Sequence, residues 1–152
     1  MSKALIAFLS LLAAFPLVFA HTQLPQNDKA PEQLPTFTEI AKQAGLAYRI
    51  TCGDEVTEYL IDVNGEGAAF LDYDNDGDQD LYLANGSSRK LQKSANPPHD
   101  YLLRNNGDGT FSDVTAKSGL GDTEWSSGAA VGDYNNDGYL DLYLTNFGPN
   151  KL

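Results

Sequence analysis

The sequence predicts an all-β fold in which short antiparallel strands recur in repeated units. The first observation behind this prediction is an internal repeat. Residues 67–85 and 128–146 align without a gap at a spacing of 61 residues, and 13 of their 19 positions are identical. The second observation is the pattern within each unit, where short apolar and aromatic runs flank loops rich in Asp, Asn and Gly. A fixed period of this kind is typical of architectures built from repeated sheets.

Each expected element follows from local chemistry. Strands are predicted at residues 68–71, 81–84, 101–104 and 110–114. Residues 105–109 (NNGDG) supply the residues that tolerate positive φ in a tight hairpin turn. One helical turn is expected at 115–118, ended by Gly119. Four short strands in about 60 residues favour the blade of a β-propeller, and the chain has room for about two blades, which leave a ring incomplete.

The N-terminal third of the chain has a different character. Residues 1–20 combine Lys3, a long apolar run and a small residue at the end of that run, the pattern of a secretory signal peptide. Residues 21–34 are polar and rich in Pro, which predicts a linker. The repeat region then spans 35–152. We therefore expect export to the periplasm, the cell surface or the medium, with no stable membrane span after the signal is removed.

Composition excludes several classes of protein. The 152 residues include 10 Lys and Arg against 21 Asp and Glu, and the resulting net charge of −11 disfavours nucleic-acid binding. The single cysteine, Cys52, excludes an internal disulfide scaffold and is expected to lack a partner within this chain. Two His residues leave little material for general acid–base chemistry, so no enzymatic activity is expected.

Two Asp-rich loops carry the strongest chemical signal. Residues 72–80 and 133–141 both follow the pattern D-x-[DN]-x-D-G-x-x-D. Oxygen-bearing side chains at positions 1, 3 and 5 can face one centre, Gly at position 6 permits a sharp turn, position 7 offers a carbonyl, and Asp at position 9 completes the set. Such hard, flexible oxygen ligands suit Ca²⁺ better than Mg²⁺. The competing interpretation is a pair of solvated turns.

Electrostatics favour a bound cation over that alternative. The first loop holds five carboxylates in nine residues, and two like charges about 5 Å apart repel by roughly 3 kcal/mol at an effective dielectric constant of about 20. An EF-hand is excluded because position 12 is Leu83 or Leu144 where that loop needs Glu, and because the residues after each loop read as strand.

The flanking residues add a family resemblance. Gly-Ala-Ala before each loop and Asp-Leu-Tyr-Leu after it resemble the FG-GAP repeats of integrin α-chain-type propellers. Residues 103–115 (LRNNGDGTFSDVT) resemble more narrowly the secreted FG-GAP/VCBS proteins of the cartilage acidic protein and ASPIC/UnbV-like family. The resemblance covers about residues 35–152. It implies a seven-bladed propeller, Ca²⁺ in the loops between strands, and an extracellular role in adhesion or recognition.

Matching positions to the family pattern gives the expected metal ligands. For site one they are Asp72, Asp74, Asp76, Asp80 and the carbonyl of Asp78. For site two they are Asp133, Asn135, Asp137, Asp141 and the carbonyl of Tyr139. Because Asn135 replaces a carboxylate, site two is expected to bind Ca²⁺ more weakly.

The leading functional hypothesis is an exported, calcium-binding FG-GAP repeat module for extracellular recognition or adhesion, in which Ca²⁺ is structural and the partner is an extracellular protein or glycan. The alternative is a glycan-binding or accessory domain of a secreted carbohydrate-active enzyme. Two blades cannot close a ring, which predicts an N-terminal fragment of a longer protein or a ring assembled from several chains. Trp125 is a candidate for a surface contact.

Overall fold

The computed structural model describes residues 34–152, so the signal peptide and all but the last residue of the linker predicted from the sequence lie outside the described residues. Residues Thr38–Leu152 form one compact unit, and the elements below belong to it. Within the described residues, no helix combines the length and apolar character that a membrane crossing requires.

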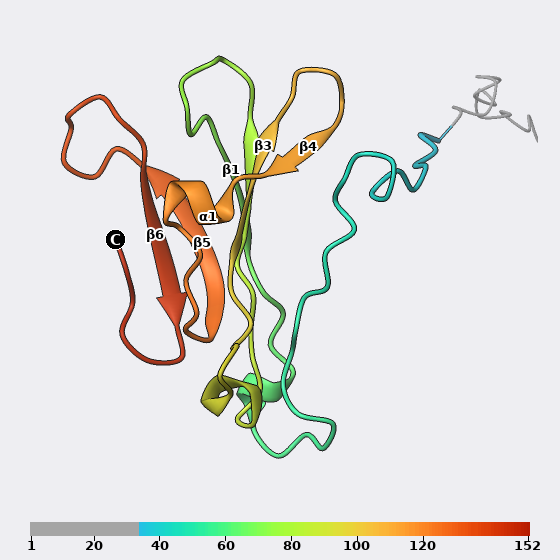
Figure 1. The fold of residues 1–152 in the computed structure, drawn as a ribbon, viewed down its shortest axis with the longest axis vertical. Coiled ribbons are helices and arrows are strands. Elements are labelled where there is room, and N and C mark those ends of the chain that lie inside the picture. The colour runs from blue at the N-terminus through green and yellow to red at the C-terminus, as the bar shows by residue number, and fades with distance from the viewer. Residues whose placement is uncertain (1–33) are drawn as a thin grey trace, which may run out of the picture. The chain divides into compact units, whose positions relative to one another are not determined.

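The first repeat folds into a four-stranded antiparallel sheet in the order β1-β2-β3-β4 (Figure 1). The strands are β1 (Ala68–Leu71), β2 (Asp80–Leu83), β3 (Tyr101–Asn105) and β4 (Phe111–Asp113). Ala68 lies opposite Leu83, and Leu83 lies opposite Tyr101. All four predicted strands are therefore confirmed, each with bounds within a residue of those expected.

The short connections also follow their local sequence. In the β3–β4 hairpin, Gly107 and Gly109 have φ of 73° and 85°, as the NNGDG turn requires. The single helical turn α1 (Thr115–Ser118) ends at Gly119, which has φ of 75° in the left-handed region. Of two 3₁₀ turns, η1 (Leu60–Asp62) precedes β1, and η2 (Leu91–Lys93) lies in the connection between β2 and β3.

The second repeat forms a two-stranded sheet from β5 (Ser126–Gly132) and β6 (Asp141–Asn146). Gly132 lies opposite Asp141, as Leu71 lies opposite Asp80 in the first repeat, so the two pairs share one register. Two open antiparallel sheets on an all-β chain fit an incomplete propeller, and this confirms the predicted fold class.

The hydrophobic core lies between the two sheets, where β1 approaches β5. Its buried members are Leu71, Tyr82, Leu102 and Leu144. The close approach depends on glycine: a Cβ added at Gly67 would lie 2.7 Å from the Cα of Gly128. The expectation that Trp125 lies at the surface is wrong, because this residue is only 4% exposed and its ring packs edge-on against Phe147.

A buried polar network also joins the two sheets. The carboxylate of Asp100 accepts hydrogen bonds from the Tyr82 hydroxyl (2.8 Å), the Ser126 hydroxyl (2.8 Å) and the Asn85 backbone N–H (2.7 Å). Tyr82 belongs to β2 and Ser126 begins β5, so one carboxylate bonds to both sheets. Burial raises the pKa of Asp100 and, together with the nearby Asp100 carboxylate, the pKa of Tyr82.

Candidate metal centre

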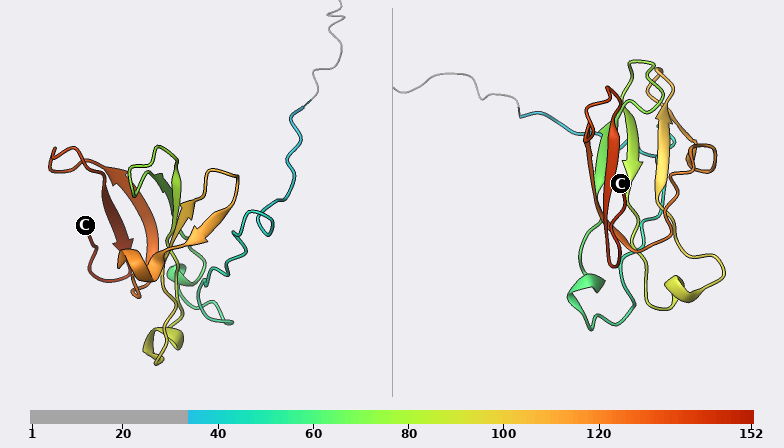
Figure 2. Two further views of the ribbon diagram at one scale, coloured as in Figure 1. Left: turned by 45° about the horizontal axis from the view of Figure 1, so that its top comes forward. Right: turned by 90° about the vertical axis from the view of Figure 1, so that its left-hand side faces the viewer.

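The Asp-rich loops connect β1 to β2 and β5 to β6, and both lie at the same end of their sheets as the β3–β4 hairpin loop (Figures 1 and 2). This arrangement follows from the shared register of the two strand pairs, because each loop starts one residue after the first strand of its pair and ends at the first residue of the second. The two Asp-rich loops are therefore displayed on one side of the unit (Figure 1).

The first loop is wound around the carboxylate of Asp72. Its two oxygens accept hydrogen bonds from the backbone N–H groups of Asp76 (3.1 Å) and Gly77 (3.0 Å). The turn needs two residues in the left-handed region, Asn75 with φ of 60° and Gly77 with φ of 94°. Gly at position 6 therefore has the steric role that the pattern predicts.

Asp80 anchors the other end of the loop. Its side chain is fully buried, with one oxygen accepting the N–H of Tyr73 (2.8 Å) and the other the N–H of Asn105 in β3 (2.7 Å). The carboxylate at position 9 is thus held by both its own loop and the neighbouring strand. Hydrogen bonds of this kind hold the carboxylate in a fixed orientation.

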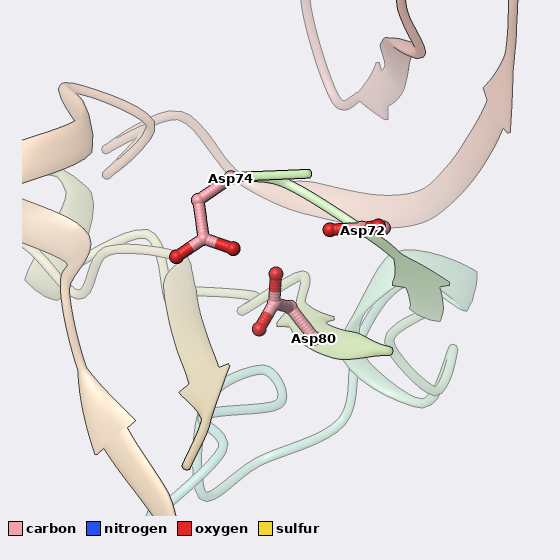
Figure 3. Close-up of side chains that lie close together, drawn as sticks. All are labelled: Asp72, Asp74 and Asp80. Atoms are coloured by element: carbon pink, nitrogen blue, oxygen red, sulfur yellow. The ribbon is translucent and has the colours of Figure 1, made fainter. Parts of the chain in front are cut away.

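Three carboxylates of this loop converge. One oxygen each from Asp72, Asp74 and Asp80 lies within 4.8 Å of the others, and Figure 3 shows the three side chains gathered beside the strand ends. Ligand oxygens on opposite sides of a Ca²⁺ ion lie about 5 Å apart, since each Ca–O distance is about 2.3–2.6 Å. The donor set consists of hard oxygens only, so both chemistry and spacing fit a divalent cation.

The electrostatics of the group point the same way. Desolvation, followed by the nearby carboxylates of Asp76 and Asp80, raises the pKa of Asp74, while Arg104 acts in the opposite direction. Mutual repulsion among carboxylates is relieved by a cation at their centre. Asp72, Asp74 and Asp80 could therefore hold a metal ion.

The second loop repeats the same backbone pattern. The carboxylate of Asp133 accepts the N–H groups of Asp137 (3.0 Å) and Gly138 (2.9 Å), and Asp141 accepts the N–H of Tyr134 (2.8 Å). Its left-handed residues are Asn136, with φ of 58°, and Gly138, with φ of 89°. The two loops thus share the backbone hydrogen bonds to the carboxylates at positions 1 and 9.

The loops differ at position 3. Asn135 accepts the N–H of Asp137 (3.0 Å) and donates its amide N–H to the Asp137 carboxylate (2.9 Å). Asn135 is therefore tied to position 5, and loop two brings one carboxylate fewer to its centre. Among the described residues, three acidic side chains lie close enough to share an ion in loop one, and not in loop two.

The predicted ligand at position 5 of each loop makes a further hydrogen bond within its own loop. The carboxylate of Asp76 is outside the converging group and accepts the N–H of Asp78 (2.9 Å). In the same way, Asp137 accepts the N–H of Tyr139 (2.9 Å). The sequence interpretation overlooked Asn105, which it assigned only to the hairpin turn. No local sequence pattern indicates its contact with Asp80, which depends on β3 lying beside β2.

These features define a class of repeat protein, in which antiparallel β-sheets carry Asp-rich loops at their strand ends, with carboxylates placed as in a cation site. Residues 72–144 match the family model described as FG-GAP-like repeat, a range that contains both loops and the strands between them. The resemblance to FG-GAP repeats predicted from the sequence is thereby confirmed.

Two curated relatives are similar to part of the chain. Cartilage acidic protein 1 of Homo sapiens is 36% identical over 72 residues, which are 46% of this chain and 11% of the relative. Cartilage acidic protein 1 of Xenopus tropicalis is 38% identical over 55 residues, which are 35% of this chain and 8% of the relative. The matched segment thus spans about a tenth of the length of these relatives.

Proposed function

We propose that the chain is an exported calcium-binding module that serves recognition or adhesion outside the cytoplasm. The observation that carries the proposal is the convergence of Asp72, Asp74 and Asp80 within 4.8 Å in a loop whose conformation is repeated at residues 133–141. Two loops whose carboxylates at positions 1 and 9 accept the same backbone hydrogen bonds, at equivalent places in two sheets, support two sites of one type.

The ion has a structural role in this proposal. The carboxylates at positions 1 and 9 are held by backbone N–H groups, which leaves them suited to fix the loop and not to exchange protons with a substrate. Bound Ca²⁺ offsets the repulsion between the carboxylates of each loop and rigidifies the end of the unit where both loops lie. Extracellular modules of this type bind Ca²⁺ with dissociation constants of about 10⁻⁴ to 10⁻³ M, and we expect that range here.

The role outside the cytoplasm rests on the predicted signal peptide and on the similarity to cartilage acidic protein 1. The partner class that follows is an extracellular protein or glycan. Nucleic acid is a poor fit, because a chain of net charge −11 repels a phosphate backbone.

Calorimetric titration of the chelator-treated chain tests the proposal. We expect two Ca²⁺ sites per chain, no comparable response to Mg²⁺, and a higher melting temperature in Ca²⁺. Asp72→Asn and Asp133→Asn should each remove one site, whereas Asp108→Asn, which changes an exposed carboxylate on the neighbouring hairpin loop, should leave both. A folded chain without a calorimetric response to Ca²⁺ would contradict the proposal.

A further inference from the structure

Asn105, the last residue of β3, joins the first Asp-rich loop to the β3–β4 hairpin loop (residues 105–109). Its backbone N–H donates to the carboxylate of Asp80 (2.7 Å), and its side-chain amide donates to the carbonyl of Gln79 (3.2 Å). Its side-chain oxygen accepts the N–H of Gly107 (3.0 Å) in the hairpin turn. One residue is therefore bonded to positions 8 and 9 of the Asp-rich loop and to the turn of the hairpin.

Position 7 of the same Asp-rich loop also lies close to the hairpin. A Cβ added at Gly107 would be only 3.1 Å from a carboxylate oxygen of Asp78. The carbonyl of Asp78 and the carboxylate of Asp80 are the two ligands expected to complete site one. The segment that supplies these last ligands, residues 78–80, is therefore the segment that borders the hairpin loop.

Two carboxylates of the converging group are held in different ways. The carboxylate of Asp72 accepts the N–H groups of Asp76 and Gly77, which belong to its own loop. The carboxylate of Asp80 accepts one of its two N–H groups from Asn105, which lies outside that loop. The orientation of Asp80 within site one therefore depends on the position of the hairpin.

The hydrogen bonds to Asp80 are compatible with a cation. Each carboxylate oxygen has two lone pairs, and Asp80 uses one oxygen for Tyr73 and the other for Asn105. Because these bonds fix the carboxylate in advance, the entropic cost of ordering it is removed from ion binding. Linkage is reciprocal, so an ion that favours the fixed Asp80 favours the hairpin conformation that fixes it by the same factor.

We propose that Asn105 is a positioning residue for calcium site one and couples this site to the hairpin loop, so that bound Ca²⁺ holds the turn at 106–109 in one conformation. This coupling rests on the calcium binding proposed above. Residues 106–109 are exposed and lie at the same end of the unit as both Asp-rich loops (Figures 1 and 2). The hairpin loop is thus the surface whose contacts with an extracellular partner depend on calcium at site one.

Hydrogen exchange on the whole chain, with and without Ca²⁺, tests the coupling. The reporter is the Asn106 amide, which donates to the Thr110 carbonyl within the hairpin (2.9 Å). The control is the Ser94 amide, which donates to Leu91 (2.9 Å) in the connection at the opposite end of β2 and β3. Saturating Ca²⁺ should slow exchange at Asn106 about tenfold relative to Ser94. Equal slowing at both amides, or none at Asn106, overturns the proposal.

Two neighbouring asparagines give a matched pair of variants, compared in an Asp133→Asn background that isolates site one. Asn105→Ala removes the side-chain bonds to Gln79 and Gly107, which hold the N–H of residue 105 in place. It should weaken Ca²⁺ binding about fivefold and remove the calcium-dependent protection at residue 106. Asn106→Ala removes side-chain bonds that stay within the hairpin. It should speed exchange with and without Ca²⁺ but keep the ratio of the two rates and the Ca²⁺ affinity.

Calorimetry and hydrogen exchange on the same samples separate the coupling from calcium binding itself. Selective protection at Asn106 that Asn105→Ala loses and Asn106→Ala keeps supports the coupling. Identical results for the two variants overturn it. Ca²⁺ binding without selective protection contradicts the coupling alone, whereas a folded chain without a calorimetric response to Ca²⁺ contradicts both the coupling and the calcium sites.

Discussion

The two repeats place nearly the same nine-residue loop in different surroundings. In the first repeat, β3 lies beside β2, and Asp80 at loop position 9 is fully buried between Tyr73 and Asn105. In the second, Asp141 keeps the bond from Tyr134 but is only half-buried. The loop conformation therefore depends on the loop sequence, whereas the burial of its anchoring carboxylate depends on the third strand.

The largest expected difference lies at these two anchors. Asp80→Ala leaves two part-buried N–H groups without acceptors, which should lower the free energy of unfolding by about 3 kcal/mol. Asp141→Ala removes one half-exposed hydrogen bond and should cost about 1 kcal/mol. Urea unfolding in chelator and high salt, where carboxylate repulsion is screened, measures both. Equal losses would contradict the role given to β3.

The buried Asp100 offers a second contrast, because Asn150 takes its place in the other repeat. Asp100 accepts the N–H of Asn85, and the side-chain oxygen of Asn150 accepts the N–H of Asn146, the repeat counterpart of Asn85. Asp100→Ala leaves Tyr82, Ser126 and the Asn85 N–H without their shared acceptor and should cost about 2 to 3 kcal/mol. Asp100→Asn copies the arrangement at Asn150 and should cost less than about 1 kcal/mol at neutral pH. Urea unfolding at neutral pH measures both losses, and equal values would contradict the comparison with Asn150.

The pH dependence of stability separates these variants further. Burial raises the pKa of Asp100 in the folded chain, so folding favours its protonated form. The stability contribution of Asp100 is therefore greatest below its unfolded pKa of about 4, and it declines as pH rises through the folded pKa. The difference between the urea midpoints of the wild-type chain and of Asp100→Asn should become smaller as pH rises from the unfolded pKa to the folded pKa of Asp100. A flat difference would refute the assignment of the shift to Asp100.

The glycines at the start of the two repeats test the packing between sheets. A Cβ at Gly67 would lie 2.7 Å from the backbone of Gly128, whereas a Cβ at Gly128 would meet the movable side chain of Thr145 at the same distance. Gly67→Ala should therefore cost about 2 kcal/mol and Gly128→Ala less. Gly132→Ala, which has open space around it, is the control. Thermal melting of the three variants gives the order.

The smallest expected effect is a difference in calcium affinity between the loops. Exchanging the residues at loop position 3 should reverse the difference in Ca²⁺ affinity, because affinity follows the number of charged ligands. Asp74→Asn should weaken Ca²⁺ binding at site one about tenfold, and Asn135→Asp should strengthen it at site two about tenfold. Calorimetry with both variants checks the exchange. Opposite or absent shifts would show that position 3 does not distinguish the sites.

Much of this fold could be predicted because each repeat contains turn sequences that mark the ends of its strands. The Asp-rich loops and the NNGDG turn mark where strands end, and the observed strands begin and end beside them. Position 6 of each loop has positive φ, a conformation that glycine adopts without steric cost, so the glycine in the amino-acid pattern is enough to indicate the turn.

The parts that escaped prediction depend on contacts between distant residues. Nothing near Asn105 in the sequence indicates that its N–H holds Asp80, because that bond needs β3 beside β2. Residues 149–152 share only a leucine with residues 99–102, yet both segments take the same place. The match lies in the backbone pairing of Leu144 with Lys151 and in the hydrogen bonds that Asn146 donates to Asn150 and Pro149. The burial of Trp125 depends on Phe147, which comes after the second loop and is distant in sequence.

The placement of the two Asp-rich loops at one end, together with the β3–β4 hairpin loop, also has a kinetic consequence. Charges gathered on one side steer an approaching partner, and the attraction fades as ionic strength shortens the Debye length, which is about 8 Å at physiological salt. The first loop carries five carboxylates, so its surface stays acidic after one Ca²⁺ binds. A basic partner should therefore dock at this end first, at a rate that falls with added salt and, more gently, with rising calcium.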